Sequence, residues 1–123
     1  MATATRCLHV LVVDDEPLIR WSIVETLTAA GHRVAEADNA ASALRAIDAD
    51  PNRDLVLLDF RLPDSNDLGL LSRIRERAPR ATVVMMTAFG TPDVIAGALK
   101  LGAARVLTKP FNMHDLQELV ATI

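Results

Sequence analysis

The sequence has little cysteine, little aromatic character and no excess of positive charge, and each shortage excludes a class of protein. The single cysteine, Cys7, cannot form an intrachain disulfide, which fits a reducing compartment. A formal net charge of −3 offers no basic face for nucleic acid. No apolar run is long enough to span a bilayer, and residues 1–13 do not read as a signal peptide. We therefore expect a cytoplasmic protein that binds neither a membrane nor nucleic acid through these residues.

Apolar residues make up 50% of the 123 residues, enough for one domain with a sizeable core. In the stretch 54–59, four apolar residues follow Asp54 without interruption and the stretch then ends in the carboxylate of Asp59, which is typical of a strand buried on both faces. Other short runs and helically spaced segments alternate with it. The spacing predicts strands over 8–13, 33–37, 54–59, 82–87 and 104–108, and helices over 16–30, 40–49, 68–78, 92–101 and 113–123. Such alternation predicts a doubly wound α/β domain with a five-stranded parallel sheet and helices on both faces.

Polar side chains stand where four of these strands end. They are Asp14 and Asp15, Asp59, Thr87, and Lys109. Because parallel strands share their carboxyl edge, we expect these groups to gather on one rim. Three crowded carboxylates require positive charge, and oxygen ligands suit Mg²⁺. The sequence therefore predicts a magnesium site with a lysine beside it.

This rim can support phosphoryl transfer. Asp59 can attack phosphorus as a nucleophile, while Mg²⁺ and Lys109 neutralise charge on the phosphoryl oxygens. Thr87 can donate a hydrogen bond, and the small Ala88 leaves room for the incoming group. Each residue alone is weak evidence, because a carboxylate or threonine at a strand end is often only a capping residue. The four strand ends together favour the phosphoryl site.

These residues resemble a known signature. The chain is similar throughout to the receiver domain of two-component response regulators, through Asp14-Asp15, Asp59, Thr87-Ala88 and Lys109-Pro110. The segments "EPLIRWS", "RLPD", "TAFGT" and "LGAARVLTKPF" look like receiver domains of nitrogen-regulator-type, sigma-54-dependent activators. The resemblance implies one receiver domain over residues 1–123. It also implies a flavodoxin-like sheet in the order 2-1-3-4-5.

The resemblance further implies roles for individual residues. Asp59 would accept phosphate from a sensor histidine kinase. Asp15 and Asp59 would bind Mg²⁺ directly, Asp14 would help through water, and the backbone carbonyl of Arg61 would complete the protein ligands. Lys109 would contact the phosphoryl group. The peptide bond that joins it to Pro110 would be cis, so that the lysine points inward.

Two positions depart from the family pattern. Asp67 replaces the usual glycine eight residues after the phosphoacceptor, so we expect a differently shaped loop. Val106 stands where the family carries a switch aromatic, which puts the usual coupling to Thr87 in doubt. Phe89 is a candidate substitute. Arg61 and Phe89 would also flank the phosphate and influence the lifetime of the phosphorylated form.

We expect the phosphorylated chain to shift between two conformers. The movable surface would be helix 92–101, strand 104–108 and helix 113–123, with Gly97 as a weak point. Through it the chain would form a homodimer or contact an effector. A linked ATPase or DNA-binding output region beyond Ile123 would then regulate transcription.

Three other functions compete with this one. A phosphohydrolase of the haloacid-dehalogenase type needs an aspartate at position 61, where Arg61 stands. A nucleotide- or flavin-binding domain would carry a glycine-rich phosphate loop, which the sequence lacks. A degenerate receiver that serves only for dimerisation would not need the complete acidic set. We therefore expect a phosphoacceptor without separate substrate turnover. We also expect Met85, Met86 and part of Trp21 in the core.

Overall fold

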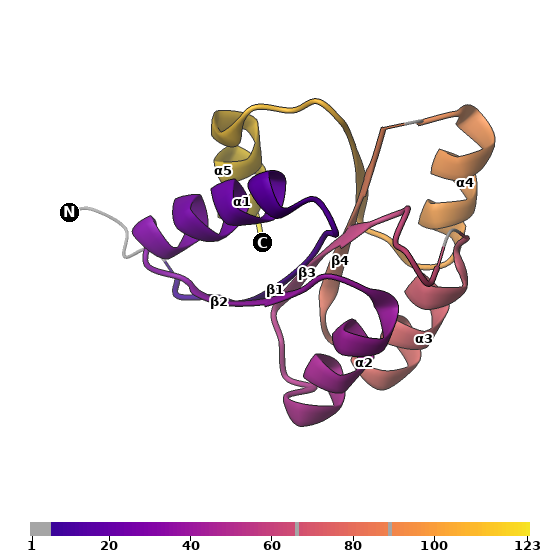
Figure 1. Cartoon of the computed structure of the whole chain (residues 1–123), viewed down its shortest axis with the longest axis horizontal. Coiled ribbons are helices and arrows are strands. Elements are labelled where there is room, and N and C mark those ends of the chain that lie inside the picture. Colours follow the sequence, from indigo (N-terminus) through magenta and orange to yellow (C-terminus); the bar gives the residue numbers. More distant parts are fainter. Residues whose placement is uncertain (1–5, 66, 89) are drawn as a thin grey trace.

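The computed structural model describes residues 6–65, 67–88 and 90–123, where five strands and five helices alternate. The strands are β1 (His9–Val13), β2 (Arg33–Ala37), β3 (Leu55–Asp59), β4 (Thr82–Thr87) and β5 (Arg105–Thr108). The helices are α1 (Pro17–Ala29), α2 (Ala40–Ala49), α3 (Gly69–Arg77), α4 (Pro92–Lys100) and α5 (Met113–Ala121) (Figure 1). The predicted elements are therefore confirmed, with ends that differ by no more than two residues.

The strands form one parallel sheet in the order β2-β1-β3-β4-β5, which confirms the predicted fold class. β3 lies at the centre, and every one of its residues is buried. β1 pairs with β3 in a register that sets Val13 beside Leu58. The residues that follow these two strands therefore emerge next to each other at the carboxyl edge of the sheet.

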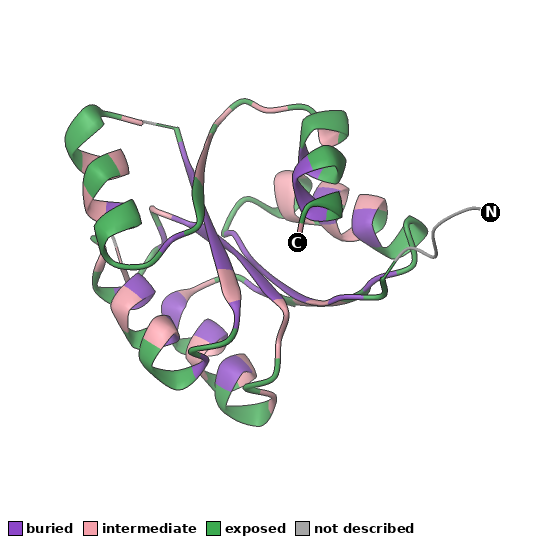
Figure 2. Ribbon diagram, turned by 180° about the vertical axis from the view of Figure 1, so that it is seen from behind, coloured by how far each residue is buried: buried purple, intermediate pink, exposed green. Residues whose placement is uncertain are grey.

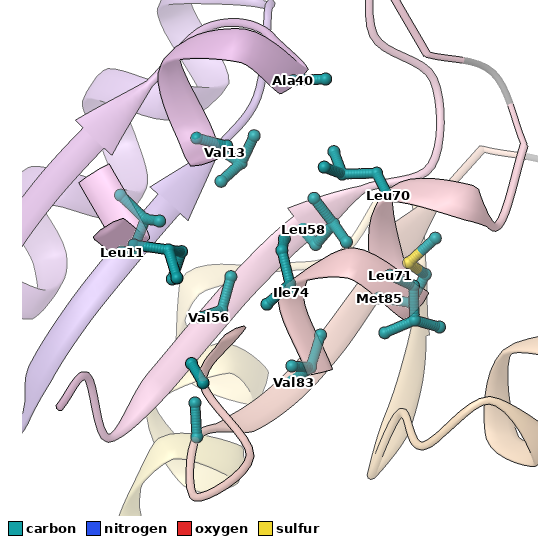
Figure 3. Close-up of a cluster of buried hydrophobic side chains, with 14 of the residues drawn as sticks. Leu11, Val13, Ala40, Val56, Leu58, Leu70, Leu71, Ile74, Val83 and Met85 are labelled. Carbon is teal, nitrogen blue, oxygen red and sulfur yellow. The ribbon is translucent and has the colours of Figure 1, made fainter. Parts of the chain in front are cut away.

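Helices cover both faces of the sheet. α1 and α5 lie on one face, and α2, α3 and α4 lie on the other (Figure 1). The buried positions follow the strands and the inner sides of the helices, while the outer sides are exposed (Figure 2). On the second face the core packs side chains from the sheet against α2 and α3 (Figure 3), including Leu11, Val56, Leu58, Leu71, Ile74 and Met85. This double cover explains why β3 is apolar from Leu55 to Leu58, with no alternation of polar residues.

The helix ends follow from local sequence. Asn39 caps α2 by accepting from the Ser42 N–H at 2.7 Å, and Thr91 caps α4 by accepting from the Val94 N–H at 3.4 Å. Gly31 and Gly102 follow α1 and α4 with φ of 94° and 105°, a conformation that glycine adopts without a steric penalty. These helices therefore begin and end at residues whose own chemistry suits a helix end. No helix within the described ranges is long and apolar enough to cross a membrane.

One sequence-based expectation needs correction. Trp21 is 60% exposed and contributes nothing to the core, because it lies half a turn away from the buried Ile23 of the same helix. A Cβ atom at Gly97 would lie 2.8 Å from Cδ1 of Leu68. The expected role of Gly97 as a weak point of α4 stays a prediction. Met85 and Met86 are buried as predicted.

Candidate functional site

Three carboxylates meet where β1 and β3 end. Asp14 and Asp15 follow β1, Asp59 ends β3, and one oxygen from each lies within 4.8 Å of the others. Asp14 is completely buried and Asp59 is 6% exposed, whereas Asp15 is open to solvent. The cluster therefore has two fixed, inward carboxylates and one accessible carboxylate at its mouth.

Lys109, directly after β5, supplies positive charge to this cluster. Its Nζ donates to Asp14 Oδ2 at 2.9 Å, to Glu16 Oε1 at 3.1 Å and to Asp59 Oδ2 at 3.2 Å. Burial opposes the charged form, but the bond to Asp14 and the negative charges around it together raise the pKa of Lys109. The lysine is therefore a permanent cation that joins the ends of β1, β3 and β5.

Asp59 is poised between opposing influences. Burial raises the pKa of its carboxyl from 3.8 to about 6, with a further upward contribution from Asp14, while Lys109 and the Arg61 N–H act in the opposite direction. The Arg61 N–H donates to Asp59 Oδ1 at 3.3 Å. Lys109 and the Arg61 N–H thus only partly offset the cost of a negative charge on Asp59. Additional positive charge at this point would stabilise it.

Thr87 ends β4 beside this cluster. It is buried, and it directly follows Met86, the register partner of Asp59. The Thr87 carbonyl accepts from the Lys109 N–H at 2.7 Å, and the bond between Lys109 and Pro110 is cis. Ala88 is exposed and lines a hollow of about 420 Å³ together with Lys109. The end of β4 therefore lies next to Lys109, beside the hollow that Ala88 and Lys109 line.

The remaining predicted residues lie around the site. Arg61 has an exposed side chain, and Val106 lies half-buried on β5 opposite Met85. Asp67, at the position where glycine is usual, accepts from the Gly69 N–H at 2.8 Å and so shapes the entry to α3. Phe89 lies outside the described residues.

Two contacts of the site were not predicted. Glu16 is the third carboxylate partner of Lys109. Arg20 on α1 donates to the Asp14 carbonyl at 2.8 Å and to Glu36 at 2.8 Å, which fixes the backbone of the acidic loop. The position of Glu16 directly after the aspartate pair is the one feature of the sequence that could have indicated that it belongs to the site. Arg20 offers no such feature, because its partners lie on another strand and in the loop.

The donor set fits a hard divalent cation. Three carboxylates supply closely spaced oxygens, and two of them are held in place by burial and by Lys109. Oxygen ligands of this type suit Mg²⁺ better than a soft transition metal. The cluster of Asp14, Asp15 and Asp59 could therefore hold a metal ion.

Comparison with known proteins identifies the family. The model of the response regulator receiver domain matches residues 10–121. The chain belongs to this family. The receiver domain is 43% identical over 112 residues to the response regulator protein PilR of Pseudomonas aeruginosa, a match that covers 91% of this chain and 25% of PilR. It is 38% identical over 111 residues to NtrC of Escherichia coli K12, covering 90% of this chain and 24% of NtrC.

Solved structures agree with the sequence comparison. NtrX from Brucella abortus superposes with a TM-score of 0.87 at 34% identity, covering 95% of this chain and 26% of NtrX. A CheY-like receiver domain from Methanospirillum hungatei gives 0.87 at 28% identity, covering 95% and 93% of the two chains. The receiver domain spans about a quarter of the length of the curated relatives it matches. The predicted resemblance to nitrogen-regulator-type receiver domains is confirmed.

Proposed function

We propose that this receiver domain is a signalling switch that accepts a phosphoryl group onto Asp59 from a sensor histidine kinase. The observation that carries the proposal is the placement of Asp59, which lies beside two further carboxylates and the half-buried Lys109. Because its pKa is about 6, the carboxylate is ionised at neutral pH and available as a nucleophile. We further propose that the whole chain forms this one domain and works in the cytoplasm.

The chemical step follows from the side chains present. A carboxylate oxygen of Asp59 forms a bond to phosphorus while the bond from phosphorus to the kinase histidine nitrogen breaks, and that nitrogen keeps the electron pair. Lys109 donates a hydrogen bond to Asp59. After the transfer, its ammonium group would stabilise the negative charge on the phosphoryl oxygens. Thr87 would donate its hydroxyl to one of these oxygens.

Asp15, Asp59 and the Arg61 carbonyl would hold Mg²⁺, with Asp14 acting through water. When bound, the ion neutralises negative charge on the transferring group. Asp14 and Lys109 then keep Asp59 oriented, since Asp14 is buried, Lys109 is half-buried, and the two are hydrogen-bonded to each other. Dephosphorylation would be slow, because position 61 carries Arg61 and no second acid that could drive hydrolytic turnover.

An acyl-phosphate donor tests the phosphoacceptor directly. We expect the wild-type receiver domain to gain the mass of one phosphoryl group in the presence of Mg²⁺, and Asp59→Asn to gain none. Removal of the metal with a chelator should abolish labelling of the wild type. Intact-protein mass spectrometry provides the measurement. Equal labelling of both proteins would place the phosphoryl group elsewhere and contradict the proposal.

The hollow beside Lys109 offers a docking surface for the kinase. Apolar side chains line it next to the reacting residues, including Leu18, Ile19, Phe111 and Met113. Leu18 is 74% exposed and lies one turn from the exposed Trp21 on α1. An apolar patch that continues into the phosphoryl site fits a partner that must bring its histidine to Asp59.

Substitutions on this patch separate docking from chemistry. Leu18→Ala and Trp21→Ala should each slow phosphotransfer from a histidine kinase on the order of tenfold, because exposed anchors of this type carry much of an interface's affinity. The rate with an acyl-phosphate donor should stay unchanged. Leu99→Ala, which removes an exposed leucine from α4, is the control and should leave both rates unaltered. A parallel loss in both reactions would point to damage at the site itself.

The output is a change in self-association or in effector contacts through α4, β5 and α5. Relatives such as NtrC, a DNA-binding transcriptional regulator, are about four times longer than the matched region, which supports a role in transcription through a linked ATPase or DNA-binding region. Val106 packs against the core cluster, so a change at Thr87 can reach β5 through packing rather than through an aromatic ring. A receiver used only as a dimerisation module would not need the buried Asp14 and Asp59 held together by Lys109.

A further inference from the structure

Asp64, in the loop that follows β3, caps a helix from a distant part of the chain. Its Oδ1 accepts from the Ala40 N–H at 2.7 Å, and its Oδ2 accepts from the Ala41 N–H at 3.1 Å. These bonds hold the pKa of the Asp64 carboxyl below its ordinary value of 3.8. The first two free N–H groups of α2 are thus satisfied by the loop, while Asn39 satisfies the third.

The same loop is tied to the phosphoacceptor at its other end. The Arg61 N–H donates to Asp59 Oδ1, directly after the strand. Leu62 and Ser65 then exchange two backbone hydrogen bonds of 2.8 and 3.2 Å, which close a turn with Asp64 inside it. The Leu62 side chain is buried in the core. Asp64 is therefore the outer anchor of a short loop whose inner anchor is Asp59.

We propose that Asp64 is a positioning residue for the metal site. By binding the start of α2, its carboxylate fixes the loop that carries the Arg61 carbonyl. This inference rests on the proposed function, in which that carbonyl is a ligand. A carbonyl ligand must be held within about 0.5 Å of its productive position. The bonds from Asp64 to α2 add an outer anchor to those that Asp59 and the buried Leu62 already provide.

The coupling must act in both directions. If the bond from Asp64 to α2 favours metal binding, metal binding strengthens that bond by the same factor. Hydrogen exchange at the Ala40 and Ala41 amides should therefore slow when Mg²⁺ is added. The Ser42 amide, which Asn39 binds, should change less. The first turn of α2 would then report occupancy of the metal site.

A comparison of two caps on one helix tests the role of Asp64. Asp64→Ala and Asn39→Ala each remove a side-chain acceptor from the first turn of α2, so both should lower the melting temperature without metal. Only Asp64→Ala should weaken Mg²⁺ binding, on the order of fivefold, as measured by isothermal titration calorimetry. Asp64→Asn keeps one carbonyl oxygen as acceptor and should give an intermediate dissociation constant.

The results separate this role from general loosening of the helix. Equal Mg²⁺ affinity in wild type and Asp64→Ala would overturn the inference and leave the proposed function standing. Equal weakening by Asn39→Ala and Asp64→Ala would also overturn it, because the effect would then come from the helix alone. A wild-type protein that binds no Mg²⁺ would instead remove the proposed function on which the inference rests.

Discussion

Replacing Asp59 with asparagine is expected to stabilise the metal-free receiver domain near neutral pH by about 2 kcal/mol. The wild-type carboxylate is buried beside Asp14, and its pKa is raised from 3.8 to about 6. The folded state therefore binds the proton more tightly than the unfolded state. The asparagine side chain would remove the charge, while Lys109 would keep its bonds to Asp14 and Glu16.

The pH dependence fixes the sign of this effect. Below pH 3.8 both states of wild type carry the proton on Asp59, so the two proteins should differ little. As pH rises from 3.8 to about 6, wild type alone loses the stability associated with this group, and the gap then stays constant. Urea unfolding across this range, without divalent metal, measures the gap. Asp48→Asn, at an exposed carboxylate on α2, is the control and should show no such divergence.

Replacing Lys109 with methionine is expected to have the opposite effect and to cost about 3 kcal/mol. The substitution leaves the buried Asp14 and Asp59 next to each other without their shared cation. Millimolar Mg²⁺ should recover part of the loss, because a bound ion stabilises the folded state by mass action. The melting temperature of this variant should therefore depend on Mg²⁺ more steeply than that of wild type.

A double substitution isolates the pair. Asp59→Asn combined with Lys109→Met should be less destabilised than the sum of the single effects, since the uncompensated charge is gone. Lys100→Met, at an exposed lysine on α4, should change stability by no more than about 0.5 kcal/mol. Additive effects, or insensitivity of Lys109→Met to Mg²⁺, would mean that the lysine does not compensate these carboxylates.

The fold could be predicted because several levels of the sequence agree. The apolar run that ends at Asp59 is too short and too continuous for an amphipathic helix, and Asn39 and Thr91 mark helix starts by their own chemistry. The rim followed from topology, since the ends of parallel strands share one edge. Lys109 therefore came close to Asp14 across 95 positions of sequence without any motif that joins the two.

Contacts made by long or loop-borne side chains could not be predicted. Glu16 reaches Lys109, and Asp64 reaches the start of α2, through geometry that no local pattern encodes. Trp21 is a different case, because helical periodicity already places it opposite the buried face marked by Ile23 and Leu27. The size and hydrophobicity of Trp21 favour a core position, but the 3.6-residue helical repeat predicts its exposure correctly.

The direct pairing of β1 with β3 has a consequence for how such a chain can diverge. The distance between the Val13 and Leu58 backbones, which directly precede Asp14 and Asp59, is set by the strand spacing of about 4.8 Å, a repeat that backbone hydrogen bonds enforce whatever the side chains are. No helix contributes to that interval. The exposed residues of every helix can therefore be substituted during evolution to bind new partners, while the spacing of the carboxylates that could hold an ion stays the same.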